Sequence, residues 1–327
     1  MVKKLVNKNL NEAKANKKDE FYTQLADVEV ELRNYKEHFK GKIVYCNCDD
    51  PRVSNFFHYF SYNFEHLGLK KLIATCYKSQ NMDLFSQNES EQAISLEYTG
   101  DKNGNNVPDL HEIGIKPLKG DGDFRSAECI ELLKEADIVV TNPPFSLFRE
   151  YVAQLVKYNK KFLIIGAQNA IIYTDIFPLI KDDKLWLGLT MNSSNRWFQV
   201  PDEYVNYHKE ENGNKFAFVA GVVWYTNLNH SKRNEAIDLY KKYNTEDYPT
   251  YDNYDAIEVS KVKEIPRDYK GVMGVPISFL HKFNPEQFEI VGCNRGIGQD
   301  VNGVYGRSSF LNGKETFKRL FIKNKKI

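Results

Sequence analysis

One short stretch of the chain, ADIVVTNPPFSLF at 136–148, combines residue types that could hold an amine. The apolar run at 138–140 predicts a buried strand, and Asn142, Pro143, Pro144 and Phe145 follow it. Prolines lack a backbone N–H and force the preceding residue toward extended backbone, so a stiff turn rich in acceptors is expected. The Asn142 side-chain oxygen and the Pro143 carbonyl could each accept one hydrogen of an exocyclic amino group. Phe145 could stack on the ring that carries the amine.

The purely structural alternative for this stretch is a strand end followed by a proline turn. A string of one small polar residue, two prolines and an aromatic ring arises by chance in only about one chain in a hundred. Its position directly after an apolar strand makes chance less probable still. We therefore interpret the stretch as functional.

Strands and helices that would position this turn alternate along the chain. Strands separated by helical segments predict a parallel α/β sheet, and ligands bind such sheets at the carboxyl ends of the strands. Residues 46–50, 120–125 and 142–145 are therefore expected on one rim. The predicted strands are 43–45, 72–74, 137–141, 162–165, 185–189 and 216–226, and the predicted helices are 53–62 with Ser54 as cap, 126–135, 147–158 and 171–180.

Two regions lack this regular pattern. Residues 80–118 are polar and are expected to be irregular, with a turn at 101–104. After residue 230 the sequence has short apolar runs broken by proline and glycine, which predicts a loop-rich module. No internal repeat or low-complexity linker separates these parts.

Composition excludes several classes of protein. The 327 residues are 42% hydrophobic, and the longest apolar stretch, 216–225, is about half of the ~20 residues that a membrane helix needs. The N-terminus has no apolar segment of a secretory signal, so a cytoplasmic protein without membrane contact is expected. The histidines show no ligand spacing, and no metal site is predicted. The five cysteines form no CxxC pair and are expected to be reduced core residues: Cys46, Cys48, Cys76, Cys129 and Cys293.

Basic residues gather at both ends of a chain whose net charge is only +1. Basic tails can contact phosphates, although they are also common features of soluble proteins. The residues are Lys3, Lys4, Lys8, Lys14, Lys17 and Lys18 at one end, and Lys318, Arg319, Lys323, Lys325 and Lys326 at the other.

The motifs together resemble a known family. TNPPF resembles motif IV of the S-adenosylmethionine-dependent amino-methyltransferases, which modify adenine N6 or cytosine N4. The stretches DEFYTQ, VYCNCDDPRVSNFF, GDGDFRS, DIVVTNPPFSLFREY and GVMGVPISFLHKFNP are similar to the EcoRI-type adenine-specific DNA methyltransferases, over roughly 19–288. The resemblance implies a Rossmann-like methyltransferase sheet, mostly parallel, with a loop-rich C-terminal target-recognition module. The implied domains are a basic N-terminal arm with a cofactor motif (1–40), a catalytic domain (41–230) and a target-recognition region (231–327).

The resemblance also implies which residues bind S-adenosyl-L-methionine at the start of the chain. EFYTQ matches motif X, which touches the methionine end of the cofactor, so Phe21, Tyr22 and Thr23 are candidates; the start of an amphipathic helix is the alternative. Motif I corresponds to DDPRVSN, which makes Asp49 and Asp50 candidates. The glycines of the family motif are absent here, which leaves the loop geometry open.

A third motif is implied to read the cofactor adenine. Asp123 and Phe124 resemble the family pair in which the carboxylate accepts a hydrogen bond from the exocyclic amine, and Asp121 is a weaker candidate. The alternative is an acidic turn that caps the helix at Ser126. The family often has an acid for the ribose hydroxyls after the second strand, but this chain has TCY at 75–77. Either Tyr77 stacks on the cofactor or the ribose is bound elsewhere.

A target base taken out of a helix needs a second aromatic face. Related enzymes carry this aromatic in a segment that corresponds to SNRWFQVP, where Phe198 is the first candidate and Trp197 the second. Either ring could equally be a plain core residue.

The family resemblance implies methyl transfer to adenine N6 in double-stranded DNA. The adenine must leave the helix, because pairing and stacking bury its amine. Asn142 and Pro143 would orient the amine and Phe145 would stack on the base. We expect a monomer that acts at a short palindrome, with GAATTC as the leading example, within a restriction–modification system. The alternatives are an RNA or protein-glutamine substrate for the same motif, or a module that binds cofactor or DNA without turnover.

Overall fold

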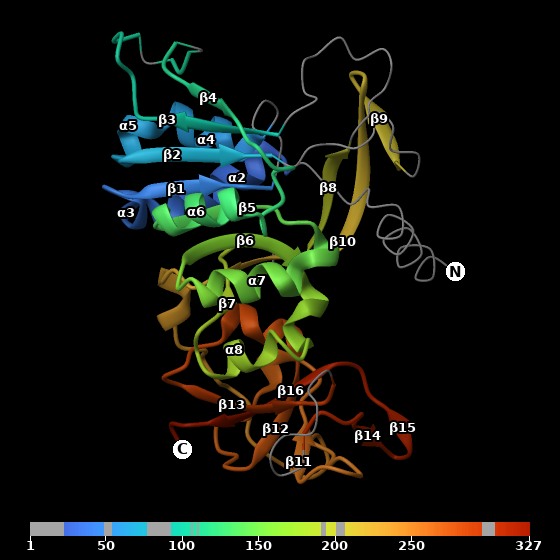
Figure 1. The fold of residues 1–327 in the computed structure, drawn as a ribbon. Helices are drawn as coiled ribbons and strands as arrows, with labels where there is room; N and C mark the ends of the chain where they lie inside the picture. The colour runs from blue at the N-terminus through green and yellow to red at the C-terminus, as the bar shows by residue number, and fades with distance from the viewer. Residues whose placement is uncertain are drawn as a thin grey trace. The chain divides into compact units, whose positions relative to one another are not determined.

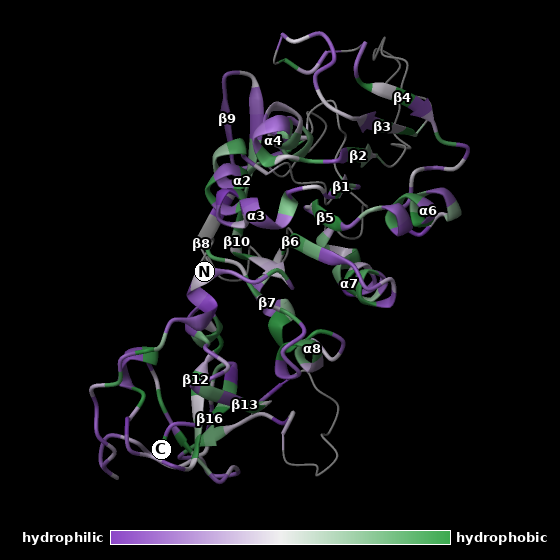
Figure 2. Ribbon diagram, turned by 90° about the vertical axis from the view of Figure 1, so that its left-hand side faces the viewer, coloured by the Kyte–Doolittle hydropathy of each residue, from purple (hydrophilic) through white to green (hydrophobic). Residues whose placement is uncertain are grey.

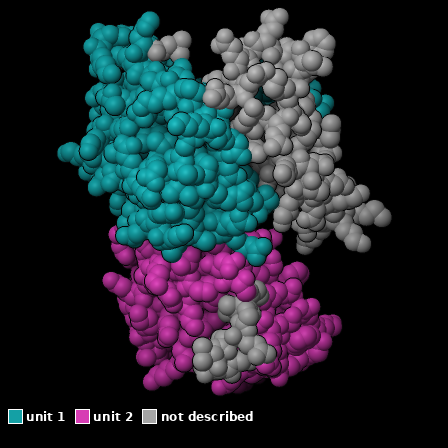
Figure 3. All heavy atoms as spheres, in the orientation of Figure 1, with its two compact units in different colours: residues 1–167, 194–228 teal, residues 168–193, 229–327 magenta. Residues whose placement is uncertain are grey.

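The chain folds as two compact units, which Figure 3 shows in different colours. The computed structural model describes residues 23–48, 54–76, 93–105, 107–109, 111–190, 194–200, 207–295 and 305–327. Unit 1 comprises residues 1–167 and 194–228, and unit 2 comprises 168–193 and 229–327. Residues 168–193 therefore group with the C-terminal region, although the sequence motifs suggest a catalytic domain that runs unbroken from 41 to 230.

Unit 1 is built around a mixed sheet in the order β4-β3-β2-β1-β5-β6-β10 (Figure 1). Strand β1 runs parallel to β2 and β5, and β5 runs parallel to β6. These strands are short and almost fully buried, as parallel strands covered on both faces should be. The expected parallel α/β sheet is confirmed. Its parallel strands are β1 (Ile43–Cys46), β2 (Lys71–Thr75), β5 (Ile138–Thr141) and β6 (Lys161–Ala167).

Antiparallel strands extend the sheet at both edges of its parallel part. Strand β10 (Asn214–Thr226) lies beside β6, and it also pairs with β8 (Ser194–Val200) and β9 (Lys209–Glu211). At the other edge β3 (Ile94–Tyr98) pairs with β2, and β4 (Gly114–Pro117) pairs with β3. The expectation that residues 80–118 are irregular is therefore wrong for these two strands. The predicted turn at 101–104 is present, with the Asp101 carboxylate accepting from the N–H groups of Asn103 and Gly104.

Helices flank this sheet, with one helical face toward the core and the other toward solvent. Helix α7 buries Phe148, Tyr151, Val152 and Leu155, the spacing of one helical face. Figure 2 shows both hydrophobic and hydrophilic segments along α6 and α7. Ser54 stands at the predicted start of α4, but its side chain makes no capping hydrogen bond. The helical elements are α2 (Leu25–Leu32), η1 (Arg33–Tyr35), α3 (Lys36–Phe39), α4 (Asn55–Tyr62), α5 (Phe64–Leu67), α6 (Ala127–Glu135), η2 (Phe145–Leu147) and α7 (Phe148–Lys157).

Unit 2 contains a second, smaller sheet in the order β11-β12-β16-β13. The strands are β11 (Ala256–Glu258), β12 (Val272–Pro276), β13 (Phe288–Cys293) and β16 (Arg319–Asn324). The expected loop-rich module therefore has an ordered sheet as its core. Glu258 and Arg319 form a buried ion pair across this sheet, at 2.7 Å between Oε1 and Nη2.

Short elements complete unit 2. The hairpin of β14 (Phe310–Leu311) and β15 (Lys314–Glu315) forms a separate two-stranded sheet. The predicted helix at 171–180 is in fact a 3₁₀ turn followed by a short α-helix, with Pro178 at the start of the latter. The remaining elements are η3 (Gln168–Ile172), α8 (Phe177–Lys181), β7 (Trp186–Leu187), η4 (Ser231–Asn234), η5 (Val262–Glu264) and η6 (Ile277–Lys282).

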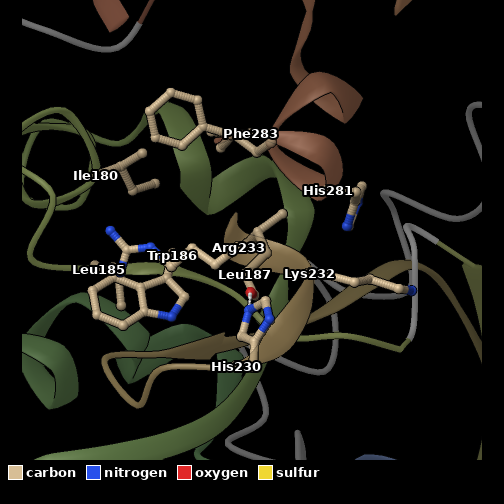
Figure 4. Close-up of a pocket in the computed structure, with 10 residues that line it drawn as sticks. Ile180, Leu185, Trp186, Leu187, His230, Lys232, Arg233, His281 and Phe283 are labelled. Atoms are coloured by element: carbon tan, nitrogen blue, oxygen red, sulfur yellow. Dashed lines mark hydrogen bonds between the residues drawn. The ribbon is translucent and has the colours of Figure 1, made fainter. Parts of the chain in front are cut away.

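A small cavity in unit 2 lies among Trp186, Arg233 and two histidines (Figure 4). The Arg233 guanidinium lies 3.5 Å from the centre of the Trp186 ring and pairs with Asp183. His230 Nε2 is 2.9 Å from the Leu187 carbonyl oxygen. The cavity measures about 20 Å³, room for roughly one water molecule. It is too small to hold a nucleotide.

Among the helices that the structure describes, none combines the length and apolar character needed to cross a membrane. The same part of the chain has no group of three or more His, Cys, Asp or Glu side chains placed to hold a metal ion. All five cysteines are free thiols, and four of them are buried.

Candidate active site

The turn that follows β5 has the stiff form expected from its prolines. Strand β5 is fully buried, and Asn142 and Pro143 remain buried beyond its end, with 6% of Asn142 exposed. Pro144 is extended, with φ −53° and ψ 125°, and its carbonyl accepts a hydrogen bond from Leu147 N–H at 3.0 Å. Phe145 opens the 3₁₀ turn and is half-buried. An amide, a carbonyl and a ring are thus fixed at the carboxyl end of one strand.

Helix α7 begins directly after this turn and reaches the end of the neighbouring strand β1. The hydroxyl of Tyr151 on α7 donates a hydrogen bond to Asn47 Oδ1, one residue past the end of β1. Both side chains are buried, and burial raises the pKa of Tyr151 well above its ordinary value. The hydroxyl therefore remains protonated and acts as a donor. Tyr151 ties the helix that follows the turn at 142–145 to the carboxyl end of β1.

The same helix also holds the loop of 121–124, which precedes α6. Gln154 Nε2 donates to the Phe124 carbonyl at 3.0 Å, and the Phe124 ring packs edge-on against Tyr151 with centroids 5.0 Å apart. Phe124 is 6% exposed. One helix thus contacts three places that the sequence assigns to one rim: Asn47 after β1, Phe124 before α6, and 142–145 through the chain itself.

Asp123 is fixed by its neighbour Arg125. The guanidinium donates from Nε to Oδ1 at 2.9 Å and from Nη2 to Oδ2 at 2.7 Å, and the Arg125 N–H also donates to Oδ1. These hydrogen bonds hold the pKa of Asp123 below its ordinary value. Ser126 caps α6 with its own side chain, which accepts from Cys129 N–H at 3.2 Å. The cap at Ser126 matches the structural alternative for this turn, and the role of Asp123 toward a cofactor stays a prediction.

Gly122 brings this loop against the end of β2. Its φ is +77°, and a Cβ at this position would lie 2.0 Å from the Cys76 carbonyl oxygen. Only glycine tolerates both the backbone conformation and the contact. Asp121 accepts a hydrogen bond from Asp123 N–H at 3.0 Å and is exposed.

Thr23 lies beside the start of α4, close in the fold to the motif I region. Its carbonyl accepts from Asn55 Nδ2 at 2.7 Å, and the residue is 1% exposed. The hydroxyl oxygens of Thr23 and Thr141 are buried, and within the described residues neither has a hydrogen-bond partner. Buried polar atoms are normally satisfied, so both hydroxyls are suited to a bound ligand.

The two candidates for the second aromatic face lie on opposite sides of β8. Phe198 is 1% exposed, whereas Trp197 is 37% exposed. Trp197 packs against Phe218 at 5.1 Å between ring centroids, and Lys209 Nζ lies 4.6 Å from its indole ring. Five further candidates, Phe21, Tyr22, Asp49, Asp50 and Tyr77, lie outside the described residues.

Sequence reasoning did not single out Asn47, Tyr151, Gln154 or Thr141. Asn47 was detectable as a polar residue directly after a buried strand. Tyr151 and Gln154 had no such signal, because each looks like an ordinary residue of an amphipathic helix. Their partners are 104 and 30 positions away in the chain.

Comparison with known proteins identifies the family. The family model described as adenine-specific methyltransferase EcoRI matches residues 9–326, so the chain belongs to this family. The family expected from the motifs is therefore confirmed, and the chain is an adenine-specific DNA methyltransferase.

Three curated relatives match over nearly their full lengths. The chain is 50% identical to the type II methyltransferase M.EcoRI of Escherichia coli, covering 100% of this chain and 99% of that protein. It is 39% identical to M.MgeORF184P of Mycoplasma genitalium and 40% identical to M.MpnI of Mycoplasma pneumoniae. These two alignments cover 97% and 96% of this chain, and 99% and 98% of the relatives. No solved structure matches the chain.

Proposed function

We propose that the chain transfers a methyl group from S-adenosyl-L-methionine to adenine N6 in duplex DNA. The observation that carries this proposal is the stiff turn at 142–145, which holds an amide, a carbonyl and a ring at the end of a buried strand. These three groups suit a planar base with an exocyclic amine. The adenine would be flipped out of the helix to reach them, at the cost of unstacking and unpairing.

The residues of the turn would act on the amine. Asn142 Oδ1 and the Pro143 carbonyl each accept a hydrogen bond from one N–H of the amine. These bonds localise the lone pair on the nitrogen and direct it away from the ring. Phe145 stacks on one face of the base. The cofactor supplies an electrophilic methyl group when bound. Holding the two reactants in one orientation would be the main source of rate, because it removes the entropy cost of their meeting.

Residues of this rim also fit the cofactor. Thr23 offers a buried hydroxyl in the segment that matches motif X. Asp123 Oδ2 accepts one hydrogen bond, from Arg125, and a carboxylate oxygen can accept a second, such as that of the cofactor amine. Phe124 supports the same loop. Phe21, Tyr22, Asp49 and Asp50 complete the proposed cofactor set.

The ring that would stack on the second face of the flipped base lies in the segment 197–198. Phe198, which is buried, is the first candidate for this face, and Trp197, which is 37% exposed, is the second. The target is a short palindrome, with GAATTC as the leading example, because a relative with 50% identity bears the name M.EcoRI. The enzyme acts as a monomer that places one methyl group on one strand per visit.

Incubation with tritiated S-adenosylmethionine tests this function. Label is expected in a duplex that contains GAATTC, and digestion of the product to nucleosides should yield N6-methyladenosine in its deoxy form. RNA hairpins and a protein extract of the same cells are the matched alternative substrates. Label in RNA or glutamine, but not in DNA, would overturn the proposal. Label at an unrelated DNA sequence would overturn only the assigned target.

A further inference from the structure

A two-stranded ribbon in unit 2, residues 307–317, extends from the small sheet as β14 and β15 (Figure 1). Its turn is Asn312-Gly313, with φ of 49° and 75°. Two consecutive residues with positive φ make the tight turn that matches the twist of a hairpin. The strands pair Phe310 with Glu315 and Leu311 with Lys314.

The ribbon is fixed at its turn by a segment more than fifty residues earlier. The Asp252 carboxylate accepts from the N–H groups of Asn312 and Gly313 at 3.1 and 2.7 Å. Asn253 bonds to the backbone of Phe310 at 3.0 Å through its side-chain oxygen. A short hairpin alone is only marginally stable, so these contacts give it a defined position.

Its base is fixed equally firmly. Asn294 Nδ2 donates to Ser309 Oγ and to the Phe317 carbonyl, both at 2.8 Å. The Tyr254 hydroxyl donates to the Arg307 carbonyl at 2.6 Å. Leu311 packs on the apolar cluster of unit 2. One side of the ribbon is therefore anchored, and the other faces outward.

The outward side presents positive charge that is not neutralised. Arg307 and Lys314 are exposed, and within the described residues neither side chain has a hydrogen-bond or ion-pair partner. The only acid of the ribbon, Glu315, is engaged by Arg295 Nη2 at 2.5 Å and by Ser308 Oγ at 2.6 Å. The Phe317 ring, at the end of the same ribbon, is 77% exposed.

We infer that this ribbon enters a groove of duplex DNA and reads base identity. A two-stranded β-ribbon fits the major groove, which is about 12 Å wide. Arg307 and Lys314 can donate to guanine acceptors, and an apolar ring can contact thymine methyl groups. The anchored turn holds the backbone that carries Lys314 in a defined position, which a reader of base edges requires. This inference rests on the proposed action on DNA and assigns part of its sequence selection.

The test uses the full-length enzyme and the site it methylates most, found by sequencing DNA from cells that express it. Methylation kcat/KM is measured on a duplex with that site and on duplexes with one base pair changed. The double variant Arg307→Ala/Lys314→Ala is expected to lose at least about 10-fold on the preferred site and less on the altered duplexes, so that discrimination falls. Phe317→Ala should lower discrimination between thymine-containing and altered sites.

Two exposed residues of unit 2 provide matched controls. Tyr240 is 78% exposed, against 77% for Phe317, and Lys242 is an exposed lysine outside the ribbon. Tyr240→Ala and Lys242→Ala should leave discrimination unchanged. Thermal unfolding shows whether each variant is folded. The charge-conserving pair Arg307→Lys/Lys314→Arg serves as a second test, because it keeps the attraction to phosphates while changing the donor geometry.

The outcomes separate the ribbon from the proposed function. Lower discrimination in the ribbon variants but not in the controls supports base reading. An equal loss on all duplexes with a weaker salt dependence would show contacts to phosphates only and overturn it, as would unchanged kinetics. A wild-type enzyme that selects a site other than GAATTC would refute the assigned target and leave the ribbon test intact. No methylation of DNA by the wild type would overturn both.

Discussion

The turn at 142–145 and the ribbon at 307–317 show two ways in which this chain builds a functional surface. The turn is made rigid by its own residue types: two consecutive prolines after a buried strand, with 6% of Asn142 exposed. The ribbon is made rigid by distant partners, with Asp252 and Asn312 60 positions apart. Its tip is exposed and basic. The groups proposed to act on an amine are thus determined by local sequence, while the groups proposed to read DNA depend on contacts across unit 2.

This difference has a physical basis. The amine of adenine has the same geometry in every substrate, so a buried, preformed turn suits all of them. Base edges lie on a large charged surface outside the protein, so their reader must be exposed. Exposed hairpins need anchoring by the rest of the fold. The comparison therefore predicts that substitutions in the turn change turnover, while those in the ribbon change site selection.

The largest expected effect is that of Asn142→Ala. Turnover should fall on the order of 1000-fold, because an acceptor fixed for the target amine is lost from a preorganised site. Cofactor affinity measured by calorimetry should stay within a few fold, and the preference among DNA sequences in binding should remain. The exposed Asn234→Ala variant is the control. Lost cofactor binding would show that Asn142 belongs to the cofactor site instead.

Lowering the pH should destabilise unit 2 more than unit 1. Burial, together with the nearby charge of Lys232, lowers the pKa of His281 in unit 2 to about 4 from 6.5. Between these values the unfolded chain binds a proton that the folded chain does not, so stability present above pH 6.5 is lost as the pH falls toward 4. The maximum loss is about 3 kcal/mol.

Hydrogen exchange measured at pH 7 and pH 4.5 can locate this loss. Amides of unit 2 should lose more protection at low pH than those of unit 1, after correction for intrinsic exchange rates. His281→Gln should reduce the difference, and His208→Gln in unit 1 serves as control. Equal loss in both units with or without His281 would refute this assignment.

Phe145 should matter through its ring rather than its identity. Stacking contributes ~1–3 kcal/mol per base, so Phe145→Ala should lower kcat/KM by roughly 10- to 100-fold. Phe145→Tyr and Phe145→Trp should cost much less. The measurement is single-turnover methylation of a fixed duplex. Similar losses in the Ala and Tyr variants would exclude stacking.

The smallest expected effect comes from Tyr151→Phe. The change removes one hydroxyl and leaves the buried Asn47 oxygen with a weaker set of donors, a cost of about 1 kcal/mol. The KM for S-adenosylmethionine should rise several-fold, with a smaller change in kcat. Tyr158→Phe, at the end of the same helix, is the control because its hydroxyl has no corresponding bond in the described structure. An unchanged KM would mean that Tyr151 supports only folding.

The sequence alone was enough to predict the parallel part of the sheet. Apolar runs such as 43–45 and 162–165 correspond to strands β1 and β6. The stiff turn at 142–145 was also predictable, because proline restricts the backbone in any context. Both predictions rest on local residue types.

Elements that depend on distant partners were not predictable in the same way. Strand β3 is mostly buried and β4 is exposed, but both lie in a polar stretch of the chain, and they form because β2 offers an edge to pair with. The sheet of unit 2 brings β16 between β12 and β13, although β16 is last in the chain. Asn47 and Tyr151 meet only because α7 folds back along the sheet.

The position of α7 has a thermodynamic consequence. The helix starts at the turn proposed for the target amine and bonds to the two loops proposed for the cofactor, through Tyr151 and Gln154. A ligand that repositions either loop therefore acts on the helix that carries the turn, so that binding at the two places is coupled. Linkage requires that the coupling be equal in both directions: if S-adenosylmethionine tightens binding of DNA by some factor, DNA must tighten binding of S-adenosylmethionine by that same factor. The enzyme would then favour the ternary complex over either binary one.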